Sequence, residues 1–575
     1  MNIRQFFPIT DWLSTYSKEQ LRGDLSAGLS VGVMLIPQGM AYAIIAGLPP
    51  IYGLYACTIP LLIYALLGTS RQLAVGPVAM VSLLTASGIG MLAEGGTELY
   101  ILLAVTLALM VGVFQFVLGI FKLGFLVNFL SHPVISGFTS AAALIIGLSQ
   151  LKHLLGVDIP RSHHVHEIIG HAIHEFGVIN WITFAIGIGG IVLIKLAKKV
   201  VKVIPGQLLA VFFGILLVAG LGLTEQGVKI VGEVPKGLPE FALPSFDLGY
   251  LEALLPIALT ISLVSFMESI AVAKAIQARH KDYKIIPNQE LIALGAANIG
   301  GAFFQSYPVT GGFSRTAVND QAGAKTGMAS VFSAVLIILT LLFLTPLFYY
   351  LPKAILASVI MVAVFGLIDY KEALHLWKSD RTDFWMLIFT FIATLTLGIE
   401  TGIGVGVLLS LAMVIYKTTR PHFAVLGQVP NTHFYRNIER FGQTIERKAL
   451  LIIRYDAQLY FANVNFVKDT LEEQIKRKGA PLEAVILNAD STNSIDSSAV
   501  HALEEITESL KERGLKLYLT GVKGPVRDAL GKSHTIEKIG RENLFMSVQE
   551  AVDYHDLKEG DKKLRFEEYV AQVNQ

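Results

Sequence analysis

Two long stretches without a charged residue constrain the fold of this chain more than any other feature. Residues 101–121 and 328–351 contain no Asp, Glu, Lys or Arg. Each stretch reaches the roughly 20 residues that a helix needs to cross the hydrocarbon core of a bilayer. Apolar runs interrupted by polar residues lie at about 24–68, 123–151, 177–196, 205–223, 253–276, 352–367 and 384–416. With 53% hydrophobic and only 16% charged residues, the chain is predicted to be a polytopic α-helical membrane protein.

The basic residues between these runs indicate the orientation in the membrane. Lys and Arg gather in cytoplasmic loops, and here they gather at 71, 122, 195–202, 279–284, 371–381 and 417–420. The intervening loops at 94–98, 152–176, 224–252 and near 400 contain few of them. This alternation predicts fourteen crossings with both termini in the cytoplasm, if two short segments near 73–90 and 309–320 count as partial spans. Residues 1–24 are polar and amphipathic, so we expect no cleavable signal peptide.

The chain is expected to divide into a membrane part and a soluble part. We predict a cytoplasmic segment at 1–23 and a transmembrane domain at 24–420, with halves at about 24–230 and 250–420. We then expect a linker at 421–435, an α/β domain at 436–560 and a tail at 561–575. Strands are predicted at 449–454, 458–461, 483–488 and 515–520, and helices at 464–478, up to 513 and from about 524. Alternating strands and helices predict a small layered sheet with helices packed against it.

Several other signals exclude functions. The net charge of +1 gives no reason to expect nucleic acid, and the lone Cys57 excludes a disulfide framework. Six of the 14 histidines lie at 152–176, but their spacing matches no defined metal motif, so a solvated loop is expected and no metal site. The motif GLSVG at 28–32 fits the hydrolase pattern G-x-S-x-G but lies inside a span, where Gly28 and Gly32 are expected to allow close helix packing. No cofactor motif or catalytic constellation is present in the sequence, so the chain is not expected to be an enzyme.

The two short segments are the informative ones. Residues 73–79 read LAVGPVA and residues 308–315 read PVTGGFSR, so each combines Gly with a nearby Pro at membrane depth. Matching breaks in the two halves of a transporter point to a site at the midplane between inverted repeats. Two half-helix N-termini that meet there would offer free N–H groups and positive dipole ends to an anion. Arg315 would make this site more positive; the alternative interpretation is that each break serves helix packing alone.

An acidic residue lies inside another apolar span. Glu268 is surrounded by LTISLVSFMESIAVAKAIQ, and an ionisable residue within the membrane is a functional hypothesis by default. Burial favours the neutral acid, whereas a nearby arginine favours the carboxylate. We expect Glu268 to carry a coupling proton; the alternative is that it only neutralises Arg315 as a structural ion pair.

Two stretches of the sequence resemble a known family. Residues 37–84, PQGMAYAIIAGLPPIYGLYACTIPLLIYALLGTSRQLAVGPVAMVSLL, are similar to the signature region of the sulfate permease (SulP) family of anion transporters. Residues 303–326, FFQSYPVTGGFSRTAVNDQAGAKT, are similar to the tenth span of that family. The resemblance implies a seven-plus-seven inverted repeat with a gate domain and a moving core domain, usually in a homodimer. The soluble part resembles the STAS domain, in which the position of Ser498 is phosphorylated in some relatives. The alternative interpretation is that Asp496 or Ser497 only caps a helix there.

The resemblance also implies which residues form the anion site. Val78 stands where the animal members often have Phe, which implies a differently shaped pocket. One branch of the family couples sodium to bicarbonate through an aspartate in the span of Glu268. Here Val272, one turn later, offers no oxygen ligand, so H⁺ is favoured over Na⁺ as the coupling ion. The residues expected to bind the anion are Gln38, Tyr42, Gly76, Val78, Ala79, Gly312, Phe313, Ser314 and Arg315.

The expected function is secondary active transport of a small anion across the cytoplasmic membrane. Sulfate or a dicarboxylate is favoured as the substrate and proton symport as the mechanism. The alternatives are a sodium–bicarbonate symporter, an anion exchanger, and a sensor whose STAS domain responds to the anion with little flux. A cytoplasmic partner that docks on the STAS domain is also expected.

Overall fold

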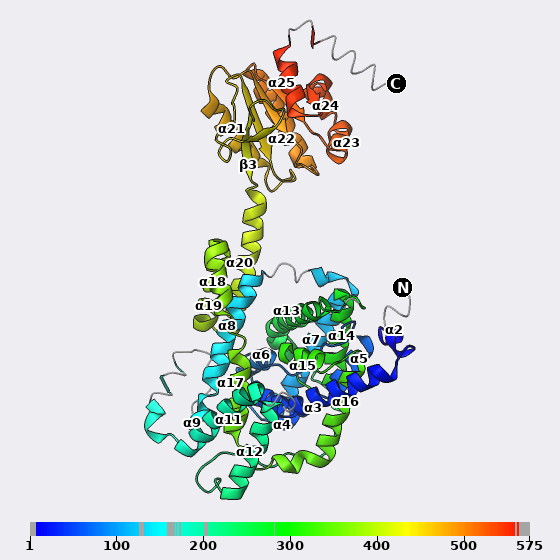
Figure 1. Ribbon diagram of the computed structural model, residues 1–575, viewed down its shortest axis with the longest axis vertical. Helices are drawn as coiled ribbons and strands as arrows, with labels where there is room; N and C mark the ends of the chain where they lie inside the picture. Colours follow the sequence, from blue (N-terminus) through cyan, green and yellow to red (C-terminus); the bar gives the residue numbers. More distant parts are fainter. Residues whose placement is uncertain are drawn as a thin grey trace. The chain divides into compact units, whose positions relative to one another are not determined.

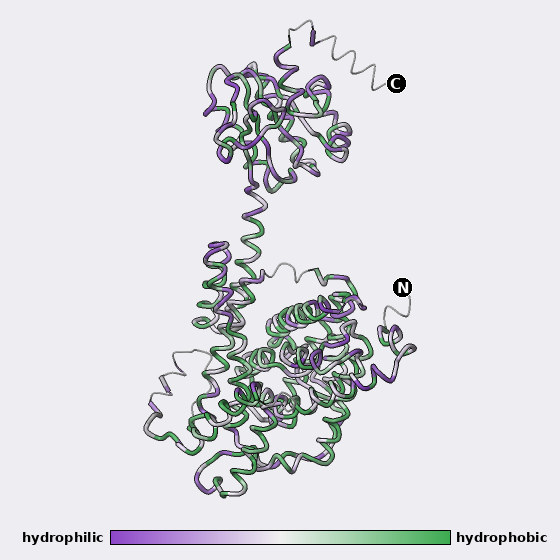
Figure 2. Tube along the Cα trace, in the orientation of Figure 1, coloured by the Kyte–Doolittle hydropathy of each residue, from purple (hydrophilic) through white to green (hydrophobic). Residues whose placement is uncertain are grey.

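The computed structural model describes residues 7–125, 131–157, 167, 170–171, 174–200, 205–280, 282–557 and 561–562. The chain forms two compact units, Met1–Leu411 and Ala412–Gln575. The first unit is helical, and its helices are coloured mainly as hydrophobic along their length (Figure 2). The second unit is a sheet with helices packed around it (Figure 1). The predicted division into a membrane part and an α/β part therefore corresponds to two separate units.

The helices of the first unit are long and apolar, as the charge-free runs predict. Among the described residues, eight helical segments are long and apolar enough to cross a membrane, and three shorter apolar helices accompany them. The helices next to the two interrupted segments, or packed against those helices, are α3 (Lys18–Ala46), α5 (Ile59–Leu67), α6 (Ala79–Gly90), α7 (Glu98–Ile120), α13 (Leu248–Gln277), α14 (Pro287–Ala302), α15 (Phe313–Gln321) and α16 (Met328–Leu339). The remaining helices of eight or more residues are α8 (His132–Ser149), α11 (Trp181–Val200), α12 (Gly206–Leu221), α17 (Lys353–Phe365), α18 (Tyr370–Ser379), α19 (Arg381–Leu397) and α20 (Ile399–Thr419).

Glycines bring the helix backbones close together. A Cβ atom on Gly28 of α3 would lie 2.6 Å from the carbonyl oxygen of Ala329 in α16, and Gly32 faces the same helix. A Cβ atom on Gly295 of α14 would lie 2.5 Å from the backbone nitrogen of Phe116 in α7. These crossings have no space for a side chain, so the expected packing role of Gly28 and Gly32 is confirmed.

The two halves of the first unit repeat one order of elements. In each half a long helix comes first, followed by two shorter helices in the first half and one in the second; a two-residue strand, a short helix and another apolar helix then follow. The strands are β1 (Val75–Gly76) and β2 (Thr310–Gly311), and they pair with each other in antiparallel orientation. Equivalent strands that run in opposite directions are what an inverted repeat requires.

The second unit is a six-stranded sheet. Its strand order is β4-β3-β5-β6-β7-β8, in which β5 to β8 are parallel and β3 is antiparallel to both of its neighbours. Side chains alternate between the faces of the sheet: Leu451 and Ile453 pack in one core cluster, and Leu450 and Ile452 pack in the other. The strands are β3 (Phe423–Gln428), β4 (Tyr435–Asn437), β5 (Leu450–Tyr455), β6 (Ala484–Asn488), β7 (Lys516–Thr520) and β8 (Leu544–Phe545).

Helices cover both faces of this sheet. Helix α25 (Val548–Asp556) packs on the face of Leu450 through Val548 and Val552, while α21 and α22 pack on the opposite face. The helices of that face are α21 (Val464–Lys478), α22 (Ser497–Glu512), α23 (Gly524–Lys532) and α24 (Thr535–Ile539). The predicted strand–helix order is thus confirmed over most of the domain.

Two expectations for the second unit are wrong. The stretch 421–435, expected to be a linker, contains β3, which pairs with β5 and buries Ala424 and Leu426. The strand expected at 458–461 is absent from the described fold, where Leu459 forms only an isolated bridge with Ile495. Short apolar runs do not reveal whether a partner strand lies beside them, which explains both errors.

Candidate functional site

The two interrupted segments meet at the pairing of β1 with β2. Val75 lies opposite Gly311 and Gly76 lies opposite Thr310. The backbone N–H of Gly312 also donates to the carbonyl of Ala74 at 3.0 Å. Gly76 has a φ of +148°, a conformation that side chains other than glycine rarely adopt. The glycines therefore permit an extended crossing, in which each segment satisfies the backbone of the other at membrane depth.

A short helix begins directly after each strand. Helix α6 starts at Ala79 after Val78, and α15 starts at Phe313 after Gly312. Neither Val78 nor Gly312 provides a side-chain cap to the helix that follows. The first N–H groups of both helices thus receive no capping side chain, and such N-termini attract anions.

Arg315 turns toward the other half of the molecule. Its side chain is 1% exposed, and Nη1 donates to the carbonyl of Pro77 at 2.5 Å. Its Nε and Nη2 have no hydrogen-bond partner among the described residues. Phe313 is 59% exposed and Ser314 is exposed as well, so the first turn of α15 presents them to open space. Arg315 thus lies behind this face and bridges the starts of the two short helices.

Glu268 lies in the same region without forming an ion pair. The Arg315 guanidinium acts electrostatically on its carboxyl group, yet in the described part of the chain Glu268 Oε2 has no hydrogen-bond partner and no ion pair joins the two residues. The next residue, Ser269, contacts Thr310 Oγ1 at 2.6 Å and accepts from the Gly311 N–H at 2.8 Å. The interpretation of Glu268 as a plain structural partner of Arg315 therefore lacks the contact it requires, while α13 is joined firmly to β2.

Helix α3 supplies the other predicted residues. Gln38 and Tyr42 are 1% and 4% exposed, on a helix that packs against both α6 and α15. The Oε1 atom of Gln38 is buried without a partner in the described structure. Tyr42 interacts electrostatically with Arg315 and with Glu268. The structure thus brings the predicted residues of α3, α6, α13 and α15 to one place.

Several supporting residues were missed by sequence reasoning. Asn298 of α14 donates to the carbonyl of Val309 at 3.0 Å and accepts from the Val309 N–H at 2.8 Å. The Asn298 amide thus forms, with the residue before β2, the pair of hydrogen bonds that a neighbouring strand would form. Tyr307 contacts Ser82 of α6 at 3.1 Å between the hydroxyl oxygens. A polar residue within an apolar span is the signal for Asn298, but its partner is visible only in the fold.

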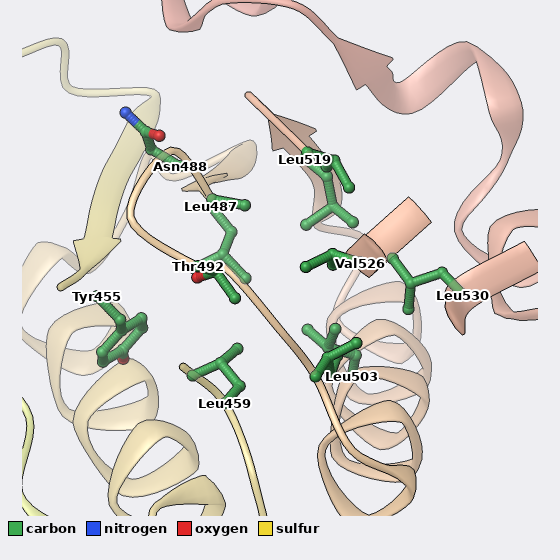
Figure 3. Close-up of a pocket in the computed structure, with 12 residues that line it drawn as sticks. Tyr455, Leu459, Leu487, Asn488, Thr492, Leu503, Leu519, Val526 and Leu530 are labelled. Carbon is green, nitrogen blue, oxygen red and sulfur yellow. The ribbon is translucent and has the colours of Figure 1, made fainter. Parts of the chain in front are cut away.

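In the second unit, the predicted regulatory residue lies at the start of a helix. Ser498 is the second residue of α22, and Asp496 caps that helix by accepting from the Ala499 N–H at 2.9 Å. A nearby cavity of about 20 Å³ lies between the sheet and α22, and its lining is mostly aliphatic (Figure 3). That volume holds about one water molecule, so this cavity does not suit an anion. Three histidines of the loop at 152–176, which was expected to be solvated, lie outside the described residues: His163, His164 and His166.

Comparison with known proteins identifies the family. A model of the sulfate permease family matches residues 21–390, and a model of the STAS domain matches residues 443–551. The chain belongs to the sulfate permease family. This member of the family is therefore a multi-pass membrane transporter with a STAS domain, and not an enzyme.

Two curated relatives cover nearly the whole permease. "Sulfate transporter 4.1, chloroplastic" of Arabidopsis thaliana is 41% identical over 567 residues, which are 96% of this chain and 82% of the relative. "High affinity sulfate transporter 2" of Stylosanthes hamata is 35% identical over 576 residues, with 96% and 86% covered.

Two solved structures resemble the permease, one over nearly the whole chain and one over about two thirds of it. The murine Solute Carrier 26 family member A9 anion transporter in the inward-facing state is similar with a TM-score of 0.88 and 26% identity, covering 96% of this chain and 94% of that one. The transmembrane domain of a cyanobacterium bicarbonate transporter, BicA, shares the fold with a TM-score of 0.60 and 22% identity, covering 69% of this chain and 98% of that one.

Proposed function

We propose that this permease carries out secondary active transport of a small anion, with sulfate favoured over a dicarboxylate, by proton symport. The observation that supports this most is the meeting of two uncapped helix N-termini at the β1–β2 pairing, with Arg315 buried beside them. Each N-terminus carries about half a positive charge, and free N–H groups bind tetrahedral oxyanions well. The curated relatives are named as sulfate transporters, which agrees with this substrate.

The coupling of anion to proton would follow from the arrangement of Arg315 and Glu268. Among the described residues, two nitrogens of Arg315 and one carboxyl oxygen of Glu268 have no hydrogen-bond partner. An anion that binds near Arg315 competes with Glu268 for its positive field. Since an unpaired carboxylate in the membrane is unfavourable, anion binding favours protonation of Glu268. Anion and proton would then cross together, by alternating access of the site to the two sides.

Uptake into proteoliposomes tests this proposal. Radiolabelled sulfate uptake is expected to be saturable and to accelerate when the outside is made acidic relative to the lumen. The Glu268→Gln variant, which cannot exchange a proton, is expected to lose this acceleration because its site is permanently neutral. If Glu268→Gln responds to the imposed gradient as the wild type does, Glu268 is not the proton carrier. Val272→Ala, one turn away, is the matched control.

The alternative functions give different results in the same vesicles. Competition by fumarate and bicarbonate at two pH values identifies the anion. A sodium–bicarbonate symporter would require Na⁺ outside at fixed pH, and an exchanger would require a counter-anion in the lumen. A sensor would bind the anion with negligible flux in the full-length chain.

We further propose that the permease lies in the cytoplasmic membrane as a homodimer with fourteen spans and both termini in the cytoplasm. The STAS domain would then be available to cytoplasmic partners, and Ser498 to a kinase. Membrane-impermeant labelling of cysteines introduced near residue 13 and in the STAS domain tests the sidedness. Labelling of both sites in intact cells would contradict it.

A further inference from the structure

A fully buried glutamate holds the loop that leads into β1. Glu290, in the first turn of α14, is 0% exposed. Its Oε1 accepts from the N–H of Thr69 at 2.6 Å, the hydroxyl of Thr69 at 2.5 Å and the N–H of Ser70 at 3.1 Å. Its Oε2 accepts from the hydroxyl of Tyr64 at 2.7 Å. Four donors from α5 and the following loop thus converge on one carboxyl group.

A fully buried aspartate holds the loop that follows α15 in the same manner. Asp24 of α3 is also 0% exposed. Its Oδ1 accepts from the N–H groups of Lys325 at 2.6 Å and Thr326 at 2.9 Å. Its Oδ2 accepts from the Thr326 hydroxyl at 2.6 Å and the Tyr16 hydroxyl at 3.1 Å.

The two clusters have the same chemistry. In each, one carboxyl group receives two consecutive backbone N–H groups, a threonine hydroxyl and a tyrosine hydroxyl. Backbone N–H groups can only donate, so a carboxylate, which only accepts, is the form that suits both clusters. All the partners found for Glu290 and Asp24 among the described residues are neutral donors, so neither cluster is an ion pair. We call them the Glu290 clamp and the Asp24 clamp.

Direct hydrogen bonds join the two clamped loops. Gln72, just after the Glu290 clamp, donates to the carbonyl of Ala324, just before the Asp24 clamp, at 3.1 Å. Asn319 of α15 donates to the carbonyl of Gln72 at 2.9 Å. The N–H of Ala74 donates to Thr316 Oγ1 at 3.0 Å. The clamps are therefore the two anchored ends of one assembly, which contains β1, β2 and the first turns of both short helices.

We propose that Glu290 and Asp24 are a matched pair of positioning residues that hold the N-termini of α6 and α15 at the separation needed by the anion. Neither residue touches the anion. Glu290 acts through the loop that leads into β1 and α6, and Asp24 acts through the loop that follows α15. The inference rests on the proposed function, since it assigns these carboxylates to the anion site formed by those N-termini.

Replacing either acid by its amide tests the role of the acceptor. In Glu290→Gln or Asp24→Asn, the amide oxygen can still face the backbone N–H groups while the NH₂ group faces a hydroxyl, but the negative charge is lost, so the charge-assisted hydrogen bonds of the clamp become weaker neutral ones. The loop is then free to shift, and the two N-termini no longer converge on the anion. For each variant we expect the KM for sulfate to rise about tenfold with a smaller change in Vmax per folded protein.

Milder variants test the same role even if the amide variants fail to fold. Tyr64→Phe and Tyr16→Phe each remove one donor while the carboxylate keeps three, so a rise in KM of about threefold is expected. Thr326→Val should raise KM as well, and Thr326→Ser, which keeps the hydroxyl, should restore the wild-type value. Ser358→Ala is the matched control, because it removes a buried hydroxyl of α17 that donates to the carbonyl of Gly187 in α11 at 2.7 Å, away from both loops.

Hydrogen–deuterium exchange provides a readout that does not depend on transport. Glu290→Gln should speed amide exchange in the peptide that contains Thr69 and Ser70, and Asp24→Asn in the peptide that contains Lys325 and Thr326. Faster exchange with an unchanged KM in the clamp variants would overturn the proposal, and so would an equal rise of KM in Ser358→Ala. If the wild type takes up no sulfate, the proposed function fails instead, whatever the exchange pattern.

Discussion

Arg315 is a charged residue that the fold holds at membrane depth by a single backbone contact. Its Nη1 donates to the Pro77 carbonyl, which has no helical N–H partner because the chain is extended there. Two further nitrogens remain unpartnered in the described structure. A buried guanidinium with unused donors is unfavourable by itself, and an anion bound at the proposed site would relieve this.

Substitution of Arg315 is therefore expected to weaken anion binding. Arg315→Gln removes the charge and the bridge to Pro77, and we expect the dissociation constant for sulfate to rise by about 10–100-fold. Arg315→Lys keeps the charge without the planar fork, so an intermediate loss is expected. Titration calorimetry on purified protein measures both. Arg381→Gln, at the exposed start of α19, should bind like the wild type, and wild-type affinity in Arg315→Gln would refute the assignment.

The stability of the STAS domain is expected to depend on pH through Asp456. Partial burial would raise the pKa of this carboxyl, but hydrogen bonds from Arg454, His422 and Ser491 outweigh it, so the pKa lies below the ordinary value of 3.8. A lowered pKa in the folded state stabilises the domain above the unfolded pKa, and this contribution disappears as pH falls through the folded pKa. Asp456→Asn should flatten that loss in thermal unfolding below about pH 4. Asp528→Asn, an exposed change in α23, should keep the wild-type profile.

At the scale of the elements, the crossing of α7 and α14 leaves no space for a side chain. Gly295 faces the Phe116 nitrogen and the Gly112 carbonyl, at 2.5 and 2.8 Å from a Cβ atom placed on it. Gly295→Val would separate two backbones, and overpacking of this kind destabilises by about 1–3 kcal/mol. We expect a clear fall in the unfolding temperature of the membrane unit in detergent. Gly404→Val of α20, where a Cβ meets nothing within 4 Å, is the control, and equal destabilisation by both would contradict this explanation.

The short helices depend on tertiary contacts for their existence. Helix α15 is only 9 residues long, and isolated helices of that length are marginal. Ser269, Asn298 and Thr316 supply the hydrogen bonds that hold its strand and its first turn. Helices α13 and α14, distant in the sequence, thus satisfy the backbone that leads into this short helix.

At the scale of the whole molecule, the sheet of the STAS unit begins earlier than its composition suggests. Strand β3 starts at Phe423 and pairs with β5. Truncation at residue 420 therefore removes the whole sheet, whereas truncation at residue 436 leaves β3 without its partner β5 and without the core that covers Ala424 and Leu426. Unpaired strands promote aggregation. By size-exclusion chromatography, we expect the first truncation to be monodisperse and the second to aggregate; identical profiles would argue against β3 as part of the domain.

The sequence by itself determined what depends on local chemistry. Charge-free runs establish the membrane class, paired Gly and Pro residues mark the two interrupted segments, and alternating strands and helices outline most of the STAS domain. Hydrophobicity and backbone preference are properties of neighbouring residues, so they can be read along the chain.

Only the tertiary structure decided how the polar groups are satisfied. The pairing of β1 with β2, the turn of Arg315 toward Pro77 and the clamps of Glu290 and Asp24 join segments far apart in the sequence. A buried polar atom must find a partner, but its identity follows from the packing of helices and leaves no local pattern. For that reason Glu268 stood out from the sequence as a lone acid in an apolar span, whereas two buried acids near helix ends became visible only with their donors around them.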